Sequence, residues 1–117
     1  MGLLSKAVDN VTDTQDYVKN CIVQYHKTIP SFHGIIVELS GDGVDQRQDF
    51  NNRIVTAVSS FGITIPLRSH RSMVLFPRFL DQELINQHLS KIFGVIKVFV
   101  FESDNPEGAF ALAQPYC

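Results

Sequence analysis

Residues 33–39 read His-Gly-Ile-Ile-Val-Glu-Leu, and residues 40–43 continue with Ser-Gly-Asp-Gly. A run of apolar and β-branched residues that is closed by turn-forming residues predicts a strand. Asp45, with Gln48 three residues later, is typical of a helix N-terminus. The stretch therefore predicts a strand followed directly by a helix, with Gly62 as the left-handed residue that ends the helix. The buried stripe of this helix is expected at Phe50, Ile54, Ala57, Val58 and Phe61.

Residues 63–101 add a hairpin, a second helix and a last strand. The short apolar runs 63–67 and 72–76 are separated by Arg68-Ser69-His70-Arg71, which predicts a hairpin with a basic tip. Pro66 lies inside the first run, and because proline has no N–H for the ladder, this strand is expected at a sheet edge. Asp81 predicts the start of a helix that stops at Gly94, and residues 95–101 predict the last strand.

The order of elements over residues 33–101 is therefore β-α-β-β-α-β. This is the order of the ferredoxin-like arrangement, in which the sheet is antiparallel with strands in the order 4-1-3-2. That order puts the strand of Pro66 at an edge, as the proline requires. We expect an α+β chain that forms a single domain over 1–117, with an added N-terminal helix over 1–30. A short C-terminal helix over 104–115 is expected to begin at Asn105 and Pro106.

The first thirty residues contain apolar side chains at alternating steps of three and four, which predicts an amphipathic helix ended by Pro30. The predicted strands are apolar on both faces, whereas a sheet with helices on one side alternates apolar with polar residues. The N-terminal helix, the C-terminal helix or a second copy of the chain must therefore cover the second face, and the N-terminal helix is the leading candidate. It either packs on its own sheet or pairs with its twin in a dimer. The candidate dimer interface consists of Val11, Val18, Ile22 and Tyr25.

The composition disfavours several classes of partner. A net charge of −2 gives no basic field for phosphates, so nucleic-acid binding is not expected. The apolar run 95–101 is too short to cross a bilayer, and no export or lipidation signal is recognised, so we expect no membrane attachment and a cytoplasmic location. Cys21 and Cys117 form no close-spaced metal or redox pair and are expected as free thiols. The four histidines are scattered, so neither a metal nor a cofactor is expected.

In the expected topology, the loop after the first strand and the tip of the hairpin lie at the same end of the sheet. Glycine N–H groups, the positive end of a helix and arginines all favour negative charge, so this end predicts a site for a small anion. Its candidate residues are Ser40, Gly41, Gly43, Arg68, His70 and Arg71, with Asp42 and Asp45 as acidic partners. The other interpretation is that the two aspartates pair with the arginines in a surface cluster of salt bridges.

The same end of this fold carries the chemistry of nucleotidyl cyclases and of diguanylate cyclases of the GGDEF type, and the chain is similar to them in topology. The hairpin at 68–73 has neither the glycine pair nor the acidic pair of their motif. The first strand and its loop offer Glu38 and Asp42, where a two-metal mechanism needs converging carboxylates. We therefore expect a non-enzymatic binding or regulatory module for protein–protein interaction that forms a homodimer. The alternative is a degenerate or active nucleotide-handling domain of the cyclase topology that uses the anion site.

Overall fold

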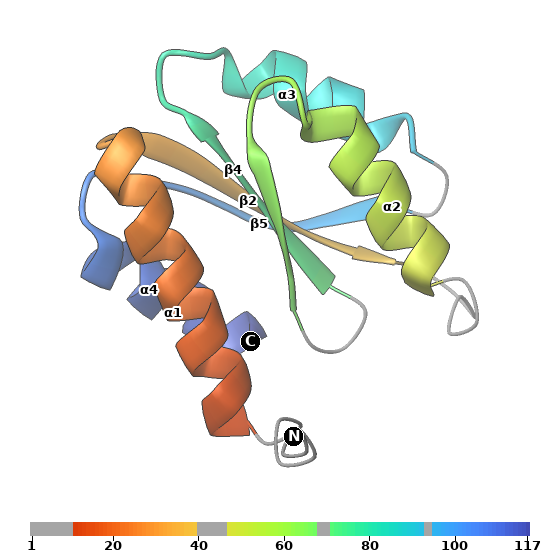
Figure 1. Cartoon of the computed structure of the whole chain (residues 1–117). Coiled ribbons are helices and arrows are strands. Elements are labelled where there is room, and N and C mark those ends of the chain that lie inside the picture. The colour runs from red at the N-terminus through yellow and green to blue at the C-terminus, as the bar shows by residue number, and fades with distance from the viewer. Residues whose placement is uncertain (1–10, 40–46, 68–70, 93–94) are drawn as a thin grey trace.

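The computed structural model describes residues 11–39, 47–67, 71–92 and 95–117 (Figure 1). In these residues it is a mixed α+β structure with one four-stranded antiparallel sheet and four helices. A short 3-10 helix, Gln114–Tyr116, follows the last of them. In chain order the elements are α1 (Val11–Thr28), β2 (Phe32–Leu39), α2 (Arg47–Val58), β3 (Ile63–Pro66), β4 (Arg71–Pro77), α3 (Gln82–Ser90), β5 (Val95–Ser103) and α4 (Pro106–Ala113).

The strands lie in the order β3-β4-β2-β5, and every neighbouring pair is antiparallel. If the strands β2, β3, β4 and β5 are numbered 1 to 4, this order is 2-3-1-4, which is 4-1-3-2 from the other edge. It agrees with the order predicted from the sequence. Pro66 is the last residue of β3, so its predicted place on an edge strand is confirmed. On the opposite edge, Ile36 pairs with Phe99 and Val37 with Lys97, so Val98 is an extra residue in β5. Such a β-bulge bends an edge strand and hinders its pairing with another chain.

Helices cover both faces of the sheet, α1 and α4 on one side and α2 and α3 on the other (Figure 1). Alternate residues of β2 enter different cores: Ile36 packs with the α1 and α4 side, and Ile35 and Val37 with the α2 and α3 side. This explains why the strands are apolar on both faces. The first core consists of Val18, Ile22, Phe32, Ile36, Ile65, Leu67, Met73, Leu75, Phe101, Ala109 and Ala113. The second consists of Ile35, Val37, Ile54, Val58, Val74, Phe76, Ile85 and Leu89.

Two helix N-termini have the caps that the sequence predicts. The Asp81 carboxylate accepts a hydrogen bond from the backbone N–H of Glu83 at 2.9 Å and caps α3. The Asn105 side chain accepts hydrogen bonds from the N–H groups of Glu107 and Gly108 at 2.8 and 3.1 Å, and Pro106 is the first residue of α4. These bonds satisfy N–H groups that a helix start leaves without a backbone partner.

The prediction for Gly62 was wrong. α2 ends at Val58, and the N–H groups of Phe61 and Gly62 both donate to its carbonyl, at 3.0 and 2.8 Å. Gly62 does not adopt the left-handed conformation; instead, a Cβ there would collide with the backbone carbonyl of Leu75. Gly34 in β2 has a similar role, because the ring of Phe101 lies where its Cβ would be. Both glycines are therefore explained by close packing within the sheet layer.

Candidate functional site

Of the residues predicted for the anion site, Arg71 lies in the described part of the chain. It forms an ion pair. Its Nε lies 3.0 Å from Oε1 of Glu38, which is its partner across the β2–β4 ladder. Its guanidinium lies 5.6 Å from the centroid of the Tyr116 ring. Both members of the ion pair are partly exposed, so the pair contributes little to stability. The pair nevertheless balances the positive charge of Arg71 with a carboxylate from the neighbouring strand.

The other residues predicted for this site lie outside the described part of the chain; they are Ser40, Gly41, Asp42, Gly43, Asp45, Arg68 and His70. The anion site, and the nucleotide-handling domain that would use it, therefore stay predictions. Sequence reasoning missed the pairing of Arg71 with Glu38 because it depends on the strand register. A glutamate near the end of one strand and an arginine at the start of its antiparallel neighbour were the available signal.

The residues predicted for a dimer interface on α1 lie largely inside the chain's own core. Val18 and Ile22 have no exposed surface and pack against β2, β4 and α4. Tyr25 is half-buried, with its ring 5.7 Å from that of Phe32 in an edge-to-face contact, and burial raises its pKa to about 12. Val11 lies in α1, but its side chain is outside the described part. The helix therefore packs on its own sheet, and Val18 and Ile22 are not accessible to a second copy.

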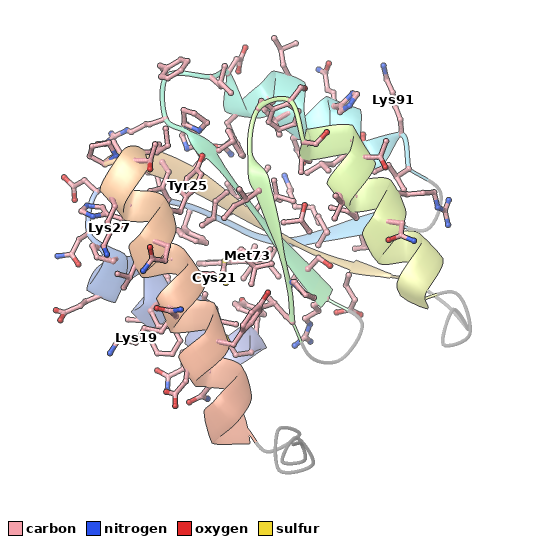
Figure 2. All side chains as sticks on the ribbon, viewed as in Figure 1. Lys19, Cys21, Tyr25, Lys27, Met73 and Lys91 are labelled. Carbon is pink, nitrogen blue, oxygen red and sulfur yellow. The ribbon has the colours of Figure 1, made fainter. Side chains whose placement is uncertain are left out.

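Cys21 and Cys117 are both free thiols, and each is partly buried. Burial raises the pKa of Cys117, which keeps the thiol protonated and unreactive at neutral pH. Burial also raises the pKa of Tyr17, with smaller contributions from the neighbouring Cys21. Figure 2 places Cys21 on α1 near Tyr25, and both line a groove beside β3.

The most exposed large apolar side chain of the described residues is Phe79, whose exposed fraction is 85%. It lies in a tight turn between β4 and α3, closed by a hydrogen bond from the N–H of Leu80 to the carbonyl of Pro77 at 3.1 Å. The N–H of Arg78 donates to the carbonyl of Ser31 at 3.1 Å, which ties the turn to the start of β2. The ring is therefore held out into solvent by an ordered segment.

An ion pair also connects this turn to the sheet. Nη2 of Arg78 lies 2.6 Å from Oε1 of Glu102 on β5, and the other oxygen of Glu102 lies 3.9 Å from Nδ1 of the buried His33. The ring of His33 in turn packs on that of Phe76, with 5.2 Å between centroids. The turn is thus joined to the start of β2 by a backbone hydrogen bond and to β5 by an exposed ion pair.

A groove of about 490 Å³ lies directly beside Phe79. Its apolar walls are Ile29 and Pro30, which follow α1, and Pro77 at the end of β4. The end of α1 and the β4–α3 connection lie at the same end of the sheet (Figure 1). We call the ring of Phe79 together with this groove the Phe79 face. It combines a projecting aromatic ring with an apolar hollow beside it.

Two further findings concern the described residues as a whole. No group of three or more His, Cys, Asp and Glu side chains among them is placed to hold a metal ion. None of the helices in the described ranges has both the length and the apolar character that a membrane crossing needs. Comparisons of the chain with protein families, with curated proteins and with solved structures find no match. The inference of function therefore depends on the geometry above.

Proposed function

We propose that the chain is a non-enzymatic interaction module that associates with a second copy of itself through the Phe79 face. We also assign the core from β2 to β5 to the ferredoxin-like fold, with α1 and α4 as additions. The support for this assignment is the strand order, together with α2 and α3 on one common face of the sheet.

The observation that carries the proposal is the exposure of Phe79 on an ordered turn. A single exposed apolar residue is ordinary on a protein surface. Phe79 differs because both of its chain neighbours are fixed: the N–H of Arg78 donates to Ser31 and the N–H of Leu80 donates to Pro77. Little backbone freedom is therefore lost when a partner covers the ring. Aromatic residues held in this way are typical of the few positions that dominate interface energies.

The adjacent groove favours a second copy as the partner. In a two-fold dimer, both subunits use the same surface, so a side chain that projects from one subunit must fit into a groove of the same surface on the other. The Phe79 face has both: the ring projects, and Ile29, Pro30 and Pro77 form the hollow. Arg78 and Glu102 add opposite charges at its margin, which a two-fold rotation can place opposite one another.

The size of this face predicts a weak dimer. Each ring would remove roughly 150 Å² of its own surface from water, and the two rings and their grooves together fall below the ~1,200 Å² of a standard interface. Burial of one phenylalanine side chain contributes about 2 kcal/mol. The two rings of a symmetric dimer then contribute about 4 kcal/mol, which is roughly a thousandfold in the dissociation constant.

Analytical ultracentrifugation of the full chain over about two orders of magnitude in concentration tests the proposal. We expect a monomer–dimer equilibrium that Phe79→Ser abolishes, with no change in thermal stability at low concentration. Leu112→Ser is the matched control, because Leu112 is an exposed apolar residue on α4, far along the chain from the turn. Equal association of the Phe79→Ser variant and the unmodified chain would contradict the proposal.

A further inference from the structure

The surface between α2 and α3 contains a groove of about 630 Å³. Its walls come from Arg53, Thr56 and Ala57 of α2 and from His88, Lys91 and Ile92 at the end of α3 and just beyond. The two helices lie side by side on one face of the sheet (Figure 1). A volume of this size lies within the range of small-molecule sites in proteins, roughly 300 to 1,000 Å³.

The charge of this groove is opposite in sign to that of the chain. The chain has a net charge of −2, yet Arg53 and Lys91 both line the groove and no described aspartate or glutamate does. Lys91 is exposed, and none of the ion pairs within the described ranges includes it. Figure 2 shows Lys91 at the end of α3, extending away from the sheet. Among the described residues, the groove is therefore lined by two cationic side chains and by no carboxylate.

The C-terminal end of α3 does not cancel this charge. A helix C-terminus is equivalent to about half a negative charge. Lys91 lies at that end, and Arg53 lines the same groove from α2, so the groove contains two cationic side chains. Arg53 already has an interaction within the chain, so the exposed ammonium group of Lys91 is the main donor that this groove offers to a ligand.

The groove also has apolar surface for the body of a ligand. Ala57 and Ile92 are partly buried and pack against the core on the α2 and α3 side. The ring of His88 lies 6.3 Å from that of Phe61 at a steep angle, which keeps the imidazole at the groove wall. Cationic donors thus lie beside a small apolar surface.

We propose that this groove binds a small phosphate monoester with a compact apolar body. Arg53 and Lys91 hold the phosphate by charge-assisted hydrogen bonds, and Ala57 and Ile92 contact the apolar part. None of the described residues that line this groove is one of the anion-site candidates that the sequence indicated. The groove is also independent of the Phe79 face, so either proposal can fail without the other.

Amide chemical shifts of the full chain, measured at constant ionic strength, test this inference with three probes. Phenyl phosphate carries both features, inorganic phosphate carries the charge alone, and phenol carries the ring alone. We expect saturable shifts with phenyl phosphate that are confined to the groove, at Thr56, Ala57, Lys91 and Ile92, and at least tenfold weaker binding of the other two.

Lys91→Gln is the decisive variant, since the side chain is exposed and its replacement leaves the packing unchanged. We expect it to weaken phenyl phosphate binding about tenfold. Lys27→Gln is the matched control, because Lys27 is an exposed lysine on α1, on the other side of the molecule (Figure 2). Shifts spread over the whole chain, or equal affinity in the Lys91→Gln variant and the unmodified chain, would overturn the inference.

Discussion

Replacement of Ile22 by alanine removes a side chain that has no exposed surface and lies between α1 and the sheet. An isoleucine-to-alanine change at a buried position costs about 2 to 5 kcal/mol, since the lost transfer energy adds to the cost of a cavity. We expect about 3 kcal/mol here, because Val18, Phe32 and Met73 are also fully buried in the same core. This is a large part of the roughly 5 to 15 kcal/mol by which a domain is stable.

Thermal and chemical unfolding at several protein concentrations measure this effect. A loss of about 3 kcal/mol should lower the melting temperature by about 10 °C. Gln24→Ala is the control on the same helix, and because Gln24 is exposed we expect a change within about 0.5 kcal/mol. A loss below about 1 kcal/mol in Ile22→Ala would refute the assignment of α1 as the cover of its own sheet. So would a loss that disappears at high protein concentration, because α1 would then act between chains.

Two further predictions concern the same side of the sheet. Gly34→Ala should lower the free energy of unfolding by about 1 to 3 kcal/mol, measured with denaturant, because the new Cβ overlaps the ring of Phe101. Adding Phe101→Leu to the same chain should recover part of that loss. If the losses of the two single variants simply add in the double variant, the contact is contradicted. Burial raises the pKa of Tyr25 from 10 to about 12, so the folded state favours the protonated phenol. The stabilisation is therefore complete below pH 10 and is lost between pH 10 and 12. Tyr25→Phe should reduce the loss of stability over this range, and unchanged alkaline unfolding curves would contradict the prediction.

The order of the elements was predictable because its signals are local. Alternating apolar runs, the caps at Asp81 and Asn105, and the missing N–H of Pro66 each act within a few residues. The same argument explains the failure at Gly62, where the sequence suggested a left-handed helix end. The requirement there comes from the carbonyl of Leu75, which belongs to another strand.

Which segment covers the second face of the sheet was not predictable in the same way. A stripe of apolar residues on α1 is the same whether it meets its own sheet or a second chain, and only the tertiary structure separates the two. The bulge at Val98 and the pairing of Arg71 with Glu38 depend on strand register, which local pattern does not determine.

The surfaces that now carry the functional proposals gave no signal in the sequence. Phe79 is one of nine phenylalanines, and its exposure follows from the turn that holds it. The groove between α2 and α3 arises because Arg53 and Lys91, far apart in sequence, line one surface when the two helices pack side by side. Both features are products of tertiary packing.

A dilution series of amide chemical shifts shows whether this chain associates through the Phe79 face. We expect concentration-dependent shifts at residues 28–31 and 77–80, with those of α1 before Thr28 and of the groove between α2 and α3 unchanged. The absence of any concentration dependence up to the solubility limit would contradict this association. Shifts centred on the edge strand β5 would contradict it equally, since they would place the contact on a different surface.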